Sequence, residues 1–362
     1  CWAIQIFMDQ RSVFKRNNLA FFVLSGMRLT ALIYGWIGLT LGACNTAPQD
    51  PAIYAPTPTL RAIRFDSAFF AMDTLHFESD LAKLVQAYPQ FSADYFNRIL
   101  MLSSKKETKK ILAFYKAYLP IYQATTKVQA SIKATPEMTD AFKRFHYYFP
   151  SYTLPTQIIY FIGPLETYGN VVTKDGLAIG LQLYMGAASS WYYSEQINTI
   201  YPTYISRQFA PEYIVVNSIQ NILNDYDVLE MNGKQLIEQM IEIGKRQYIL
   251  GQCIPTASDT LLLGYTGNQL KAIQENKGDI WTFLSSQNRL FSVDPNLTSA
   301  ILREAPYNDY FGEDIPGNVG KYIGYLIVES WMNQQKGKSK NDLNRLLKTP
   351  AKTIFDEAPV DF

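Results

Sequence analysis

Apolar residues recur at helical spacing along most of the chain, and a short run in the middle breaks this pattern. In the first third they predict amphipathic helices, interrupted at Pro89 and Pro120 because proline lacks the amide hydrogen that a helix interior needs. The segments 156–163 and 176–186 are instead rich in isoleucine and tyrosine, which indicates strands. From residue 211 onward the helical spacing returns. The pattern therefore predicts an α+β fold, mostly helical, in which a small antiparallel sheet precedes a helical C-terminal half.

The N-terminal region carries a second pattern, which indicates export. A basic residue after Met27 is followed by an apolar run, residues 29–43, and then by Cys44. The last residues of this run, Leu-Gly-Ala-Cys, match the lipobox of bacterial lipoproteins, in which the cysteine thiol receives a lipid. The run of about 15 residues is shorter than the roughly 20 that a membrane-spanning helix needs. We therefore predict a lipid anchor at Cys44, with residues 1–43 as the signal peptide region and Met27 as its start.

The segment 44–59 is predicted to be a tether between this anchor and the folded part. It contains four prolines, which favour extended backbone and pack poorly. No repeat and no linker divides the rest of the chain, so residues 60–362 are predicted to form a single domain. The lipid at Cys44 would then hold this domain at a membrane.

Composition argues against several kinds of site. The chain has only two histidines, His76 and His146, far apart in sequence, and its three cysteines form no C-x-x-C pair. A zinc site normally needs such residues at close spacing, so we predict no metal and no cofactor. The formal net charge of +1 gives no basic field that would attract nucleic acid.

The glycines near residue 320 raise the question of a phosphate site. Gly320-Lys321 is followed by Tyr322 rather than by serine or threonine, so the phosphate-binding loop motif is not met. Gly320 and Gly324 lie four residues apart, on one face of a predicted helix. They are predicted to let another helix or strand approach closely.

Residues 211–225, PEYIVVNSIQNILND, have the spacing of a zinc-protease helix without its chemistry. In the motif H-E-x-x-H, Asn217 would replace the first histidine, Ser218 the glutamate and Asn221 the second histidine. Asparagine is a poor zinc ligand, and serine cannot act as the general base that a glutamate would be. Two interpretations stay open: a protease-like scaffold without the protease, or an amphipathic helix whose polar residues fall at this spacing by chance.

Several stretches together resemble one family, the gliding-motility lipoprotein GldB of Bacteroidetes. They are the lipobox at Cys44, RFDSAFFAMD at 64–73, YPQFSADYF at 88–96, EYIVVNSIQNILND at 212–225 and DIPGNVGKYIGYLIVESWM at 314–332. The resemblance covers essentially the whole chain from Met27. It implies a lipoprotein of the cell envelope that supports gliding motility and the associated type IX protein secretion.

The same family resembles zinc-dependent proteases of the zincin type, in which a later helix supplies a glutamate in a Glu-Gly pair. Here that pair reads Ile243-Gly244, so an apolar side chain replaces the carboxylate. The resemblance therefore implies a pseudoenzyme without metal, altered at Asn217, Ser218, Asn221 and Ile243. We expect Ile243 and Gly244 to approach the Asn217 face from the next helix.

Three functions follow from these observations and stay open. The first is a non-catalytic lipoprotein that binds other proteins of the gliding and secretion machinery. The second is a hydrolase that uses no metal or an unrecognised site, and the third is an envelope protein that binds a ligand. In the phylum that the resemblance indicates, surface export often relies on an acidic cluster after the acylated cysteine, and the residues after Cys44 lack one. The resemblance therefore implies an outer-membrane position facing the periplasm.

Overall fold

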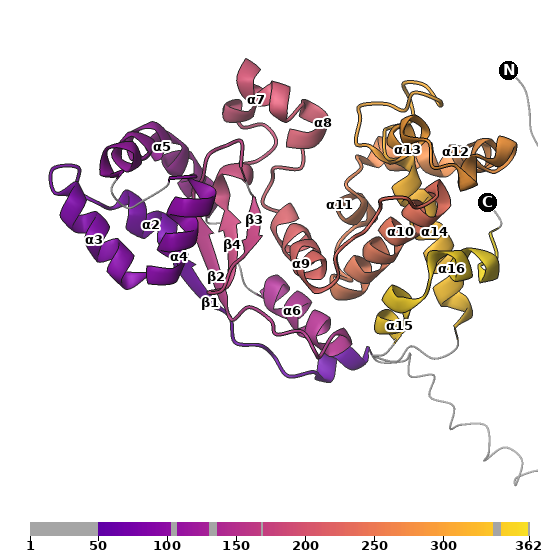
Figure 1. Ribbon diagram of the computed structural model, residues 1–362, viewed down its shortest axis with the longest axis horizontal. Helices are drawn as coiled ribbons and strands as arrows, with labels where there is room; N and C mark the ends of the chain where they lie inside the picture. The colour runs from indigo at the N-terminus through magenta and orange to yellow at the C-terminus, as the bar shows by residue number, and fades with distance from the viewer. Residues whose placement is uncertain (1–49, 103–106, 130–135, 168, 336–341, 361–362) are drawn as a thin grey trace, which may run out of the picture. The chain divides into compact units, whose positions relative to one another are not determined.

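The computed structural model describes residues 50–362, except for 103–106, 130–135, 168, 336–341 and 361–362 (Figure 1). The predicted signal peptide region and Cys44 lie outside the described residues. Pro51–Phe362 group into one compact unit by their contacts. The fold is α+β and mostly helical, as predicted.

The N-terminal part is mainly helical and begins with a 3₁₀ turn and a strand. Its elements are η1 (Pro51–Tyr54), β1 (Arg61–Arg64), α2 (Phe65–Phe70), α3 (Phe77–Ala87), α4 (Pro89–Asp94), the π-helical turn η2 (Tyr95–Ile99), α5 (Thr108–Gln129) and α6 (Pro136–Tyr148). The predicted break at Pro89 is confirmed, since Pro89 begins α4. The predicted break at Pro120 is wrong: α5 continues through it. Pro120 lies on the exposed side of α5, while Ile111 and Ile121 are buried, so packing outweighs the missing hydrogen bond.

Four residues of the predicted tether, Pro51–Tyr54, form a 3₁₀ turn instead of extended backbone. Ala52 in η1 is fully buried, and η1 packs against α6. The Lys143 ammonium on α6 donates a hydrogen bond to the Ile53 carbonyl. The prediction of an extended tether is therefore wrong for Pro51–Tyr54.

The sheet has four strands in the order β1-β2-β4-β3. β2 (Gln157–Phe161) pairs in parallel with β1 and with β4 (Leu177–Gly180), whereas β3 (Asn170–Val172) pairs antiparallel with β4. The prediction of a purely antiparallel sheet is therefore wrong. The helices α2–α6 lie between β1 and β2 in the chain, and such a long crossover is what a parallel pair requires. The predicted strand at 176–186 ends early, because a 3₁₀ turn, η3 (Leu181–Leu183), follows β4.

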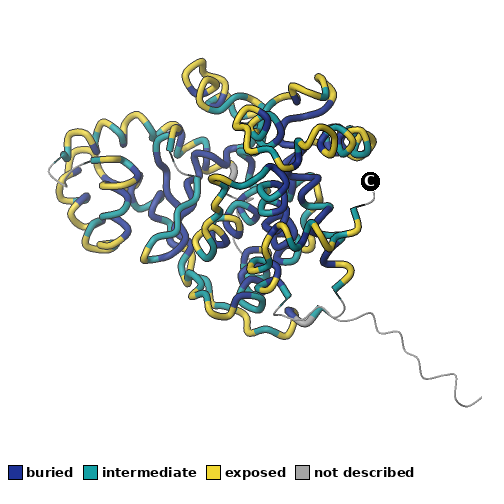
Figure 2. The backbone as a smooth tube through the Cα atoms, turned by 45° about the vertical axis from the view of Figure 1, so that its right-hand side comes forward, coloured by how far each residue is buried: buried dark blue, intermediate teal, exposed yellow. Residues whose placement is uncertain are grey.

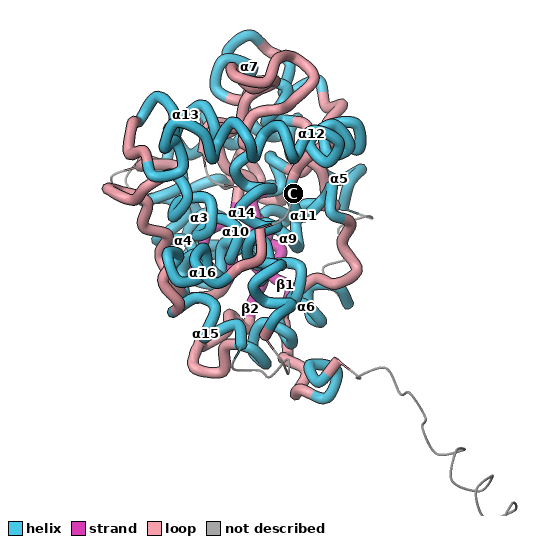
Figure 3. Tube along the Cα trace, turned by 90° about the vertical axis from the view of Figure 1, so that its right-hand side faces the viewer, coloured by secondary structure: helices cyan, strands magenta, loops and turns pink. Residues whose placement is uncertain are grey.

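The second half is helical, as predicted. After the 3₁₀ turn η4 (Ser190–Tyr193), its elements are α7 (Glu195–Ile200), α8 (Thr203–Ser206), α9 (Tyr213–Tyr226), α10 (Leu236–Cys253), α11 (Asp259–Leu263), α12 (Gly267–Ser285), η5 (Ser286–Phe291), α13 (Pro295–Leu302), α14 (Val319–Gln334), α15 (Asp342–Lys348) and α16 (Ala351–Glu357). Helices α10 and α14 pack extensively and lie side by side (Figures 1 and 3). Gly324 lies directly against the backbone of α10, which confirms the close approach predicted for this glycine.

The buried core extends from the sheet to the central helices (dark blue in Figure 2). Near the sheet, aromatic rings from α2, α4 and η2 pack edge to face; Phe65, Phe91 and Tyr95 are at most 1% exposed. In the part of the chain that the structure describes, no helix combines the length and the apolar character that crossing a membrane requires.

Candidate functional site

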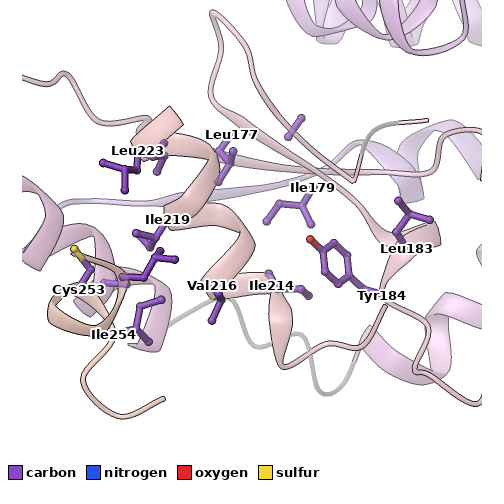
Figure 4. Close-up of a cluster of buried hydrophobic side chains, with 14 of the residues drawn as sticks. Leu177, Ile179, Leu183, Tyr184, Ile214, Val216, Ile219, Leu223, Cys253 and Ile254 are labelled. Carbon is purple, nitrogen blue, oxygen red and sulfur yellow. The ribbon is translucent and has the colours of Figure 1, made fainter. Parts of the chain in front are cut away.

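Helix α9 carries three of the four residues that the sequence singles out. Its apolar residues, among them Ile214, Ile219 and Ile222, are buried. In Figure 4 the apolar side chains of α9 gather with residues of β4. Asn217 and Asn221 lie one helical turn apart, so they project from one side of α9, toward β3 and Tyr184. The burial of the apolar stripe thus fixes where the polar residues point.

A polar network joins α9 to β3 and to the turn after β4. The Tyr184 hydroxyl lies 2.7 Å from the side-chain amide of Asn170 and accepts a hydrogen bond from Asn217 Nδ2 at 3.0 Å. The Asn170 side chain also lies 3.2 Å from Ser218 Oγ. Asn221 Nδ2 donates to the backbone carbonyl of Asn170 at 3.5 Å. The structure therefore brings together Asn217, Ser218 and Asn221, around two residues that the sequence did not single out.

The orientation of the Asn170 amide decides what Tyr184 can still bind. With its nitrogen toward Tyr184, the amide also donates to the Gly169 carbonyl at 2.8 Å, and its oxygen accepts from Ser218 Oγ at 3.2 Å. In this orientation the nitrogen of the Asn170 amide faces acceptors and its oxygen faces donors. The Tyr184 oxygen then accepts from both asparagine amides, and its own O–H is free to donate to another group.

Burial raises the pKa of Tyr184 to about 12, and the hydrogen bonds from Asn217 and Asn170 oppose this shift. Tyr184 therefore stays neutral at physiological pH. It can donate a hydrogen bond, but it is not a base under these conditions.

The network lines an open cleft of about 290 Å³. Its polar lining consists of Asn170, Tyr184, Asn217, Gln220, Asn221 and Asn224, and none of the described residues that line it carries a charge. Asn221 Oδ1 is buried and has no hydrogen-bond partner among the described residues. The cleft thus offers uncharged donors and acceptors.

The later helix, α10, contacts α9, but its Gly244 is turned toward α14. A Cβ atom added to Gly244 would lie 2.2 Å from the carbonyl oxygen of Gly324, so Gly244 packs against α14. The expectation that Gly244 faces Asn217 is therefore wrong. Ile243 is half-buried on α10, and its approach to α9 stays a prediction, as does the protease-like scaffold.

The two histidines and Cys253 do not line this cleft. His76 is exposed and lies 2.8 Å from Asp73, and His146 belongs to α6. Cys253 is fully buried, and burial raises the pKa of its thiol, which keeps it protonated and unreactive. Among the described residues, no three or more histidine, cysteine, aspartate and glutamate side chains lie close enough to hold a metal ion. The predicted lipidation site, Cys44, lies outside the described residues.

Asn170 and Tyr184 carry no sequence signal that would have identified them. Asn170 lies in a three-residue strand, too short to show an alternating pattern. Tyr184 is one of 25 tyrosines, and it lies within the segment 176–186 that was predicted to be a strand. Only the pairing of β3 with β4 brings the two residues together.

The model of one protein family, described as gliding motility protein GldB, matches residues 46–360. The chain belongs to this family. GldB membership indicates a role in gliding motility, and the family name indicates a lipoprotein of the cell envelope. No curated protein and no solved structure matches the chain.

Proposed function

We propose that this GldB protein supports gliding motility, and the associated type IX protein secretion, by binding other envelope proteins rather than by catalysis. A lipid at Cys44 holds it to the outer membrane, on the periplasmic side. The lipobox, the family match and the chemistry of the α9 site support this proposal.

The observation that carries the proposal is the composition of the polar network. General acid–base catalysis is most efficient when the group titrates near the working pH. The amides of Asn217 and Asn221 and the hydroxyl of Ser218 do not titrate there, and the pKa of Tyr184 is about 12. These side chains bond mainly to one another and to β3. The network thus acts as a structural tie between α9 and the sheet.

Complementation of a gliding-deficient deletion strain tests this role. We expect Asn217→Ala/Ser218→Ala to restore gliding at near-normal speed, with a stability loss of about 1 kcal/mol for each lost hydrogen bond. Asn268→Ala, at an exposed position on α12 outside the lining of this cleft, is the control. Loss of gliding with the double variant, at unchanged abundance and melting temperature, would show that these side chains do chemistry or bind a ligand.

A second candidate function is the binding of a neutral ligand in the α9 cleft. It is favoured by the free Tyr184 O–H and the unpartnered Asn221 Oδ1, which could bind hydroxyl or amide groups of a sugar or a peptide. Thermal-shift measurements with N-acetylglucosamine oligomers and a neutral tripeptide amide test it. Stabilisation of the wild-type chain that Asn221→Leu abolishes would support ligand binding, and no shift with either probe would reject it.

A further inference from the structure

A second cleft opens beyond the crossing of α10 and α14. It has a volume of about 270 Å³ and is lined by the C-terminal parts of both helices and by α11. Its lining starts at Gln247 on α10 and Tyr325 on α14, shortly after the two glycines at which these helices touch. The close approach at Gly244 and Gly324 therefore places side chains of two helices around one space.

The charge of this cleft is negative. Glu329 and Asp259 line it, and among the residues that the structure describes no lysine, arginine or histidine does. Within the described ranges, neither carboxylate has an ion-pair partner. The last turn of α10 adds the partial negative charge of a helix C-terminus. A cationic ligand is the complement of this surface.

Gln247 gives a second, independent indication that a donor belongs here. The residue is only 7% exposed, and its Oε1 atom is buried without a hydrogen-bond partner in the described structure. A buried acceptor left unbonded costs free energy, and a ligand with several N–H groups would remove that cost.

Tyrosines favour an organic cation over a metal ion. Tyr248 and Tyr325 line the cleft, and the face of a tyrosine ring attracts ammonium and guanidinium groups. The Tyr325 hydroxyl donates to Glu329 Oε1 at 2.6 Å. Burial and this hydrogen bond raise the pKa of Tyr325, so the tyrosine stays a donor and holds the carboxylate in place.

We propose that this cleft binds a basic side chain, an arginine or a lysine, from a protein partner. The inference rests on the proposed function, because it supplies a binding site for one of the envelope proteins. The guanidinium or ammonium group would donate to Glu329, Asp259 and Gln247 Oε1. A water molecule in the liquid occupies about 30 Å³, so the cleft has room for such a group with a few waters.

Calorimetric titration of the full chain in detergent, with N-acetyl-arginine amide as the probe, tests the cleft. N-acetyl-citrulline amide has nearly the same shape without the charge and is the control ligand. We expect saturable binding of the arginine probe and binding of citrulline weaker by about tenfold or more. Glu329→Gln should weaken arginine binding by about tenfold, because it removes the charge while its amide oxygen still accepts from Tyr325. Glu195→Gln, an exposed position on α7, should change nothing.

Three results would overturn the proposal. In the first, the wild-type chain binds the citrulline probe as tightly as the arginine probe. In the second, Glu329→Gln binds the arginine probe as tightly as the wild type does. In the third, calcium chloride binds at Glu329 and the arginine probe does not bind. The variant also separates this inference from the proposed function. If Glu329→Gln abolishes arginine binding and the cells still glide normally, the cleft does not hold the partner, while the proposed function stands.

Discussion

Replacing Gly324 by alanine should separate the two central helices. An added Cβ would lie 1.9 Å from the Met240 carbonyl oxygen and 2.5 Å from its carbon. Carbon and oxygen pack at roughly 3.5 Å, so α10 and α14 would have to move apart by about 1.5 Å. The obstructing atoms are backbone and cannot rotate away. Overpacking of this kind costs about 3 kcal/mol, and the better helix propensity of alanine offsets about 1 kcal/mol, which leaves a net loss of about 2 kcal/mol.

Gly251→Ala is the matched control, because Gly251 lies on α10 and has room. Its added Cβ would be 3.7 Å from Leu262 Cδ1, an ordinary contact. This variant should be as stable as the wild type or more stable, by up to about 1 kcal/mol. Urea unfolding followed by tryptophan fluorescence gives the free energy of unfolding of each variant. Equal stability of Gly324→Ala and Gly251→Ala would refute the close backbone contact.

Three further predictions concern the network, alkaline pH and the anchor. Tyr184→Phe removes the hydroxyl that joins Asn170 to Asn217 and should lower the free energy of urea unfolding by about 1–2 kcal/mol. Burial raises the pKa of Tyr160 and Tyr184 to about 12, against 10.0 for an exposed tyrosine. The unfolded chain therefore loses these protons first, and stability should fall between about pH 10 and pH 12, by up to about 2.7 kcal/mol for each tyrosine. Unfolding measured across this range should show a shallower fall for Tyr184→Phe. Cys44→Ala should abolish labelling of the chain by radioactive palmitate, and undiminished labelling would reject the predicted lipid anchor.

Local sequence patterns were enough to predict most of the helices and the close contact of Gly324 with α10. The apolar spacing of α9 and the Gly320–Gly324 pair both reflect what neighbouring turns of one helix present. The sheet was harder to predict. Whether β1 and β2 pair in parallel depends on the long crossover between them, and the sequence of either strand alone does not show it. The predicted break at Pro120 failed for a related reason: tertiary burial of the flanking residues outweighs the local cost of proline.

The polar site could be predicted only in part. The spacing of Asn217, Ser218 and Asn221 places them near one another on α9, which a helix guarantees. Their partners, Asn170 and Tyr184, come from other elements, and nothing local marks them. The acidic cleft was missed for the same reason, since Gln247, Asp259 and Glu329 belong to three helices.

The central claim is that this GldB protein acts by binding other envelope proteins. The most direct test is the mass of the native complex, measured by size-exclusion chromatography with light scattering after gentle solubilisation from gliding cells. The same chain expressed alone in a host without gliding machinery is the reference. We predict a larger complex with stoichiometric partner proteins in the gliding cells. An identical mass in both hosts, from cells that glide normally, would contradict the account.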